Sequence, residues 1–167
     1  MRDISLHILD IVQNSIAAQG TTIYIEIDED AEKDLLTFTI SDNGVGMDGQ
    51  MVDHIFNPFC TTRTTRKVGL GLPLLKASAE GSDGYVHIES KQGEGTQIKA
   101  AFKISHIDRP PLGKIDETIV TLIACNPDID FIYTHITNRG KFFFDTRDIK
   151  NKIAGISIAQ PEILKFI

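Results

Sequence analysis

Cysteine is scarce in this sequence, and long hydrophobic runs are missing. The two cysteines, Cys60 and Cys125, are too few for a disulfide framework or a metal motif, so we expect free thiols that fill small semi-apolar spaces. The apolar runs fall far short of the roughly 20 residues that span a bilayer, and the first residues lack the pattern of a secretory signal. These absences predict a cytoplasmic protein with no membrane contact.

A surplus of positive charge is also missing. The 17 lysines and arginines are outnumbered by 23 aspartates and glutamates, which gives a net charge of −6. Proteins that bind nucleic acid usually carry a basic surplus, so we expect no nucleic-acid partner. The 167 residues, of which 41% are hydrophobic, suit one domain or one domain with a small appendage.

Two common phosphate-binding motifs are absent as well. No G-x-x-x-x-G-K-[ST] run occurs, which excludes a P-loop. Gly69 and Gly71 could begin a dinucleotide fingerprint, but Leu74 stands where the third glycine belongs, and a basic loop precedes them instead of a strand. Any nucleotide site must therefore be built on another fold.

Hydrophobic periodicity predicts helices and neighbouring pairs of strands up to residue 104. The predicted helices cover 4–18, 49–55 and 69–80, and the predicted strands cover 22–28, 35–41, 84–90 and 96–104. Because the strands come in adjacent pairs, this order favours a mixed, mostly antiparallel sheet with helices on one face. We therefore expect an α+β fold, a two-layer α/β sandwich, and not a doubly wound parallel sheet.

A change in composition at Pro110 and Pro111 divides the chain. We expect an amino-terminal domain over 1–106 and a small carboxyl-terminal α/β appendage over 107–167. The predicted elements of the appendage are a helix at 116–125, strands at 130–138 and 140–145, and short helical pieces to the end.

Three consecutive phenylalanines, Phe142 to Phe144, lie in the last predicted strand. Large aromatic side chains are mostly buried, so we expect them in the core. If they are exposed instead, they mark a partner surface.

The first candidate for chemistry is the pair Asp10 and Asn14 in the opening helix. A spacing of four places both side chains on one helix face, one turn apart. Carboxylate and amide oxygens suit magnesium, and a carboxylate can serve as a base for a water or hydroxyl nucleophile. The alternative is a solvated polar stripe.

The second candidate is the run from Asp42 to Met47, DNGVGM, directly after a strand. Gly44 and Gly46 lack a Cβ, so the backbone can approach a flat ligand closely there. Asp42, at the strand end, can accept a hydrogen bond from the exocyclic amino group of adenine. The alternative is a plain Asn-Gly turn.

The third and fourth candidates follow each other in the chain. The loop from 57 to 67 combines hydroxyls, two arginines and a lysine in an acidic protein, which suits a polyphosphate. Gly69 and Gly71 then lead into a helix, whose free amino-terminal N–H groups favour anions. The alternatives are an exposed basic loop and a flexible helix start.

Taken together, these segments resemble a known family. Five boxes of the GHKL superfamily of ATPases and kinases have similar segments here, in the same order. The asparagine box matches LDIVQNSIAA, the first glycine box DNGVGM and the phenylalanine box IFNPFCTTR. The second and third glycine boxes match VGLGLPLLK and GEGTQIKAAF. That superfamily includes gyrase B subunits, Hsp90, sensor histidine kinases and MutL. The resemblance covers residues 4 to 104 and implies a Bergerat-type fold that binds ATP and Mg2+.

The resemblance assigns roles to individual residues of the helix and the strand ends. It implies that Asn14 holds Mg2+ and that Asp10 stands where the ATPases have a general-base glutamate. It implies that Asp42 recognises the adenine amino group and that Thr96 lies near the adenine. Gly44 and Gly46 match the glycines beneath the base, and Met47 matches an apolar residue against the ring.

The resemblance also implies a nucleotide lid and a phosphate contact. Gly69, Leu70 and Gly71 match the helix start that contacts the phosphates. Arg63 stands where many kinase-like members have a lysine after a threonine pair, here ending in Thr62, and Lys67 falls in the lid.

These residues predict a Mg2+-dependent ATP-binding regulatory protein with kinase-type phosphoryl transfer or weak ATPase activity. Its partners would be ATP or ADP and a protein partner or phosphoacceptor. Asp10 is shorter than glutamate, which argues against efficient hydrolysis.

The alternative from another class is a nucleotide-gated protein-interaction module without turnover. A third reading is a fragment of a larger machine such as a type II topoisomerase, against which the acidic balance counts.

Overall fold

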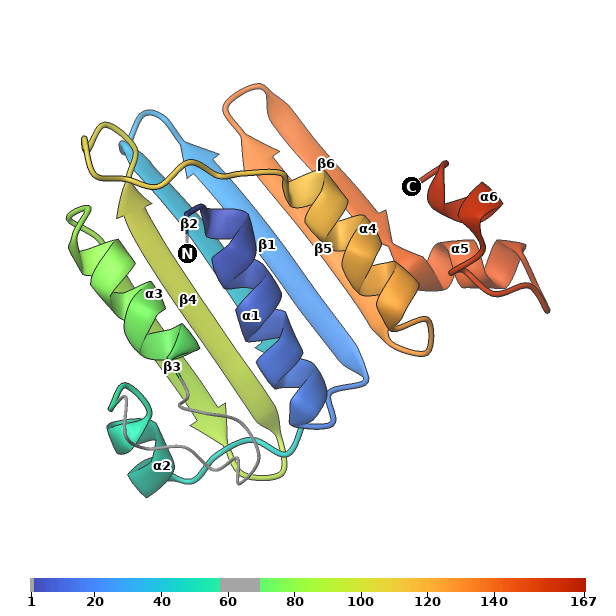
Figure 1. Cartoon of the computed structure of the whole chain (residues 1–167), viewed down its shortest axis with the longest axis horizontal. Helices are drawn as coiled ribbons and strands as arrows, with labels where there is room; N and C mark the ends of the chain where they lie inside the picture. The colour runs from blue at the N-terminus through green and yellow to red at the C-terminus, as the bar shows by residue number, and fades with distance from the viewer. Residues whose placement is uncertain (1, 58–69) are drawn as a thin grey trace.

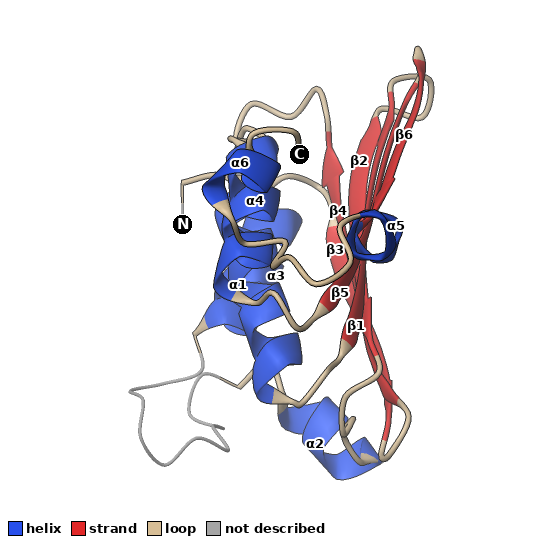
Figure 2. Cartoon of the chain, turned by 90° about the vertical axis from the view of Figure 1, so that its right-hand side faces the viewer, coloured by secondary structure: helices blue, strands red, loops and turns tan. Residues whose placement is uncertain are grey.

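The computed structural model describes residues 2–57 and 70–167, and Figure 1 shows helices lying over a twisted sheet. The elements are α1 (Ile4–Ala17), β1 (Thr22–Asp30), β2 (Leu35–Asp42), α2 (Gly49–His54), α3 (Gly71–Glu80), β3 (Tyr85–Lys91), β4 (Gly95–Lys103), α4 (Ile115–Cys125), β5 (Asp130–Thr137), β6 (Gly140–Asp145), α5 (Thr146–Lys152) and α6 (Pro161–Leu164). Figure 2 shows the two layers from the side, with α1, α3 and α4 on one face of the sheet. The predicted two-layer α+β fold is confirmed.

The sheet has six strands in the order β3-β4-β2-β1-β5-β6. The predicted hairpin of β1 and β2 is present, with Ile25 opposite Ile40. β1 and β5 run parallel, whereas every other neighbouring pair is antiparallel. The sheet is therefore mixed and mostly antiparallel, as the paired strands predicted.

The core lies between the helices and the sheet because the strands alternate apolar and polar residues. In β1 the buried positions are Ile23, Ile25 and Ile27, and the residues between them face the other side. Ile8 and Ile11 of α1 are buried with them. Burial of one such side chain contributes about 1.5–3 kcal/mol, so this contact holds α1 on the sheet.

The carboxyl-terminal segment continues the same sheet. β5 pairs with β1 along its whole length, and α4 packs beside α1. Ahead of α4, the backbone amides of Ile4 and Ser5 donate to the carbonyl groups of Pro111 and Leu112, both at 2.9 Å. The α/β appendage thus adds two strands to one end of the sheet, and the division of the chain near residue 106 stays a prediction.

Two expectations about side chains were wrong. Phe142 and Phe143 are 56% and 55% exposed, because β6 is the last strand of the sheet, whereas Phe144 packs against the core as expected. Cys125 is a free thiol as predicted, but it is exposed and does not fill an apolar space; Cys60 lies outside the described residues. Within the described residues, no helix is both long and apolar enough to cross a membrane.

Candidate functional site

Asp42 ends β2 and is held by two hydrogen bonds. The Ser15 hydroxyl of α1 donates to Asp42 Oδ2 at 2.5 Å, and the Gly44 amide donates to Asp42 Oδ1 at 2.9 Å. Each carboxylate oxygen has two lone pairs, so both oxygens can accept a further donor. The carboxylate is therefore oriented but not saturated.

Thr96 lies beside Asp42 because the two are opposite each other in the pairing of β2 with β4. Ser90, on β3, extends the row: its hydroxyl lies 2.8 Å from the Thr96 hydroxyl and accepts a 2.8 Å hydrogen bond from the Met47 amide. The structure thus brings Asp42, Met47 and Thr96 to one end of three strands. Ser90 was not predicted, because only the strand register shows its place.

The two glycines after Asp42 allow the loop to approach the protein's own backbone. A Cβ at Gly44 would lie 2.5 Å from the Ala18 carbonyl oxygen. Gly46 has φ +65°, and a Cβ there would lie 2.0 Å from the Lys91 carbonyl oxygen. Both positions therefore require glycine for local packing, and their contact with a ligand stays a prediction.

Asn43 of the same motif has a structural role that the sequence did not indicate. Its side-chain oxygen accepts hydrogen bonds from the Thr21 and Thr22 amides at 2.8 and 3.0 Å, and its Nδ2 donates to Thr21 Oγ1 at 3.0 Å. This side chain joins the loop after β2 to the turn between α1 and β1.

Asp10 and Asn14 lie one turn apart on α1, as predicted. Asp10 reaches the first residue of α3: a Cβ at Gly71 would lie 1.6 Å from Asp10 Oδ2. A carboxylate is stabilised there by the partial positive charge of a helix amino end. Asn14 is half-buried, and its side-chain amide makes no hydrogen bond with the described residues.

The start of α3 offers backbone donors next to Asp10. Leu70, at the N-cap, is 46% exposed and gives no side-chain hydrogen bond to the helix. The first amides of a helix have no partner within it, so this end suits an anion. Thr62, Arg63, Lys67 and Gly69 lie outside the described residues, and their assigned roles stay predictions.

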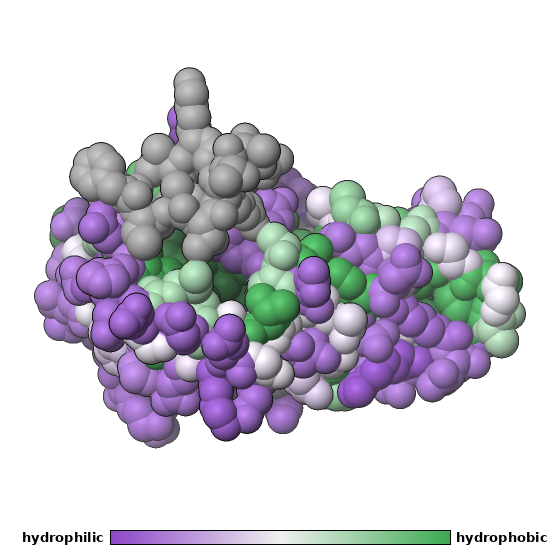
Figure 3. All heavy atoms as spheres, turned by 90° about the horizontal axis from the view of Figure 1, so that it is seen from below, coloured by the Kyte–Doolittle hydropathy of each residue, from purple (hydrophilic) through white to green (hydrophobic). Residues whose placement is uncertain are grey.

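Figure 3 views the molecule from the end where α2 and the loop after β2 lie. Hydrophobic residues, in green, show between hydrophilic ones at this end. Small-molecule sites commonly combine such apolar surface with a few fixed polar groups.

Comparison with known proteins places these residues in a family context. The family model for histidine kinase-, DNA gyrase B-, and HSP90-like ATPases matches residues 2–106. A putative sensor protein of Shewanella frigidimarina is 33% identical over 103 residues, which are 60% of this chain and 16% of the relative. Sporulation kinase D of Bacillus subtilis is 31% identical over 100 residues, which are 59% of this chain and 19% of the relative.

The chain thus spans less than a fifth of these relatives' lengths. Among solved structures, the Aquifex aeolicus MutL ATPase domain complexed with ADP has a TM-score of 0.52 at 16% identity, covering 92% of this chain and 68% of that one. The amino-terminal domain of a DNA repair protein has a TM-score of 0.58 at 18% identity, covering 86% and 52%. At these identities the likeness shows the fold.

Proposed function

The chain belongs to the histidine kinase-, DNA gyrase B-, and HSP90-like ATPase family, and from that premise we propose that it is a Mg2+-dependent ATP-binding regulatory protein. Its activity would be kinase-type phosphoryl transfer or weak ATP hydrolysis. The observation that carries the proposal is the Asp42 carboxylate, which Ser15 and Gly44 orient beside Thr96 while leaving acceptor capacity on both oxygens. A carboxylate prepared in this way suits the amino group of adenine.

The residues on α1 fit a magnesium ion. Asn14 has a half-buried amide that makes no hydrogen bond with the described residues, and Asp10 lies one turn before it. Amide and carboxylate oxygens suit Mg2+, which keeps several of its waters. When bound, the ion would neutralise charge on the phosphates.

The start of α3 supports a phosphate position next to these residues. Gly71 lies against Asp10, and the amides of the first turn have no side-chain cap from Leu70. Backbone N–H groups and the helix dipole would hold an anion there. Asp10 would then orient a protein hydroxyl, a histidine or a water as the nucleophile and accept its proton.

One observation favours a second function, a nucleotide-gated protein-interaction module without turnover. Asp10 Oδ2 lies against Gly71 at the start of α3, so its carboxylate already contributes to helix packing. A general base must contact the nucleophile's proton. The contact of Asp10 with Gly71 holds the carboxylate in place and so hinders that role. In either function, the acidic charge balance favours a protein partner over a nucleic acid.

Calorimetric titration of ATP and ADP, with and without Mg2+, tests the proposal. Asp42→Asn should weaken binding of both nucleotides about 10- to 100-fold, because a hydrogen bond to a charged acceptor is worth about 1.5–3 kcal/mol. Asn14→Ala should remove mainly the Mg2+-dependent part. Asp128→Asn, in the turn after α4, and Asn151→Ala, on α5, change exposed residues. They are the matched controls and should bind like the wild type.

The two functions separate in a turnover assay. Asp10→Asn should abolish phosphate release or transfer in the first function while sparing nucleotide affinity. A wild type that binds ATP but releases no phosphate and labels no candidate acceptor supports the second. Absence of binding at saturating nucleotide and Mg2+ would overturn both.

A further inference from the structure

Among the residues that the structure describes, β6 is an edge strand that pairs with β5 alone. A two-residue turn joins the strands, with Thr137 opposite Gly140. In such a hairpin alternate pairs exchange both backbone hydrogen bonds, so the N–H and C=O groups of Lys141 and Phe143 point away from β5. Figure 2 looks onto this edge. α5 lies beside the carboxyl end of β6, and no helix that the structure describes covers the rest of the strand.

The two edges of the sheet differ in how they are protected. β3, at the other edge, exposes Glu89 and Lys91 beside Tyr85, and α2 packs against it. Natural edge strands are usually guarded by such charges or by a covering element. β6 instead exposes Phe142 and Phe143. Before its last residue, Asp145, the strand has one charged side chain, Lys141. The β6 edge can therefore pair with a further strand.

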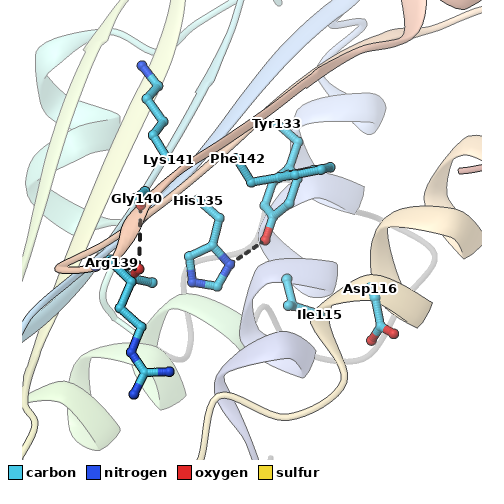
Figure 4. A pocket seen from close by; sticks show the side chains of 9 residues that line it. Ile115, Asp116, Tyr133, His135, Arg139, Gly140, Lys141 and Phe142 are labelled. Carbon is cyan, nitrogen blue, oxygen red and sulfur yellow. Dashed lines mark hydrogen bonds between the residues drawn. The ribbon is translucent and has the colours of Figure 1, made fainter.

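A cavity of about 530 Å³ opens beside β6 on the helix side of the sheet (Figure 4). Ile115, Tyr133 and Phe142 give it apolar walls, and the Tyr133 and Phe142 rings lie 6.1 Å apart. His135 is fixed at its floor: Nδ1 lies 2.9 Å from the Tyr133 hydroxyl and Nε2 lies 2.7 Å from Glu29. An open cavity of mainly apolar surface next to an unpaired strand edge can receive a side chain from an added strand.

The segment that contains β6 has a charge opposite to that of the whole protein, although two of its cations, Arg147 and Lys150, are paired with Asp145 and Asp130. Residues 138–152 contain five lysines and arginines against two aspartates, in a chain with net charge −6. Arg139 and Lys141 make no ion pair with any described residue, and Figure 4 shows them pointing to opposite sides of the hairpin. Asp116 lies on the other side of the cavity from Arg139 in this view. This arrangement favours an acidic partner.

We propose that β6 receives an extended acidic segment of a partner protein as a further strand of the sheet. Alternate residues of that segment point to opposite faces. On the helix side an apolar side chain fills the cavity beside Phe142, and on the other side acidic side chains face Lys141. The backbone of the segment bonds to Lys141 and Phe143. This site is separate from the nucleotide site and does not depend on it.

Selection from a displayed library of nine-residue peptides on the full chain, without nucleotide, tests the proposal. The selected peptides should alternate apolar and acidic residues, and a synthetic representative should bind by fluorescence anisotropy. Phe143→Pro should weaken its binding at least 10-fold while the fold is kept, because the lost N–H points away from β5 and proline is tolerated at such edge positions. Phe143→Val, which keeps the N–H, is the matched control.

Two further measurements keep the test decisive. Lys141→Glu should change the selected peptides from acidic to basic. In the wild type, hydrogen exchange at the Lys141 and Phe143 amides should slow when the peptide is added, which does not depend on any variant folding. Three results would overturn the proposal: no enriched peptide, binding that Phe143→Pro leaves unchanged, or a dimer of this chain that buries β6 and leaves it closed to peptides.

Discussion

The Ser15 hydroxyl and the Asp42 carboxylate are joined by a 2.5 Å hydrogen bond across 27 residues of sequence. Ser15 is 4% exposed on the inner side of α1, and Asp42 is the last residue of β2. The bond therefore couples the helix layer to the sheet at the end where the predicted nucleotide residues meet. It also sets the direction of the carboxylate that would contact adenine.

Replacing Ser15 by alanine should weaken ATP binding about 5- to 10-fold, because one intramolecular hydrogen bond contributes about 1 kcal/mol. Calorimetry measures this loss. Ser5→Ala is the matched control: Ser5 is also buried on α1 and donates to a carboxylate, Asp3, at 2.6 Å. It should lower stability without changing nucleotide affinity. Equal affinities for both variants would show that the Ser15 bond does not prepare the site.

Gly71 and Asp10 define a second testable contact. A Cβ at Gly71 would lie 1.6 Å from Asp10 Oδ2, so Gly71→Ala should displace the carboxylate and cost about 1–3 kcal/mol of unfolding free energy. Gly49→Ala, at the start of α2 with no atom within 4 Å of the new Cβ, should be neutral or stabilising. Urea unfolding measures both.

A double-mutant cycle identifies the cause of the loss at Gly71. Asp10→Ala combined with Gly71→Ala should be less destabilising than the sum of the single changes, because the clash disappears with the carboxylate. Additive losses would mean that Gly71→Ala acts elsewhere in α3.

The site residues that belong to a sequence motif were predicted. Those that reach the site through strand register or helix packing were missed. Asp42 and Thr96 were predicted from their segments, and β2 and β4 place them opposite each other. Ser15 and Ser90 reach the same place through long-range packing and strand pairing, which neither local periodicity nor composition records.

The same limit explains the error at Phe142 and Phe143. Alternation along a strand predicts which residues share a face, but it does not predict whether the strand is central or at an edge. The position of β6 follows from the parallel pairing of β5 with β1, a contact between segments more than a hundred residues apart. The pattern of paired strands nevertheless predicted the mixed two-layer fold.

Gly46 offers a comparison between two glycines with left-handed backbones. Gly46 has φ +65° and a Cβ there would lie 2.0 Å from the Lys91 carbonyl oxygen, whereas Gly93 has φ +83° and open space. Gly93→Ala should cost about 1 kcal/mol for the backbone alone. Gly46→Ala should cost more, because it adds a clash with backbone that cannot move aside. Thermal or urea unfolding of the two variants checks the order, and equal losses would contradict it.

His7 is buried on α1, 2% exposed, and neither of its ring nitrogens has a hydrogen-bond partner in the described part of the chain. Burial disfavours the charged ring and lowers the pKa of His7 from 6.5 to about 4. The unfolded chain therefore binds a proton between these pH values that the folded chain does not. Stability contributed by neutral His7 is present above pH 6.5 and is lost as the pH falls toward 4.

Replacing His7 by leucine should remove this dependence. Between pH 7 and pH 4.5 the wild type should lose about 2–3 kcal/mol more unfolding free energy than His7→Leu, since one pKa unit corresponds to about 1.4 kcal/mol. Urea unfolding at the two pH values measures the difference, and the contribution of the carboxylates cancels between the proteins. His54→Leu, at an exposed position of α2, should keep the wild-type loss. If His7→Leu loses as much stability as the wild type, the ring does not titrate as a buried neutral group.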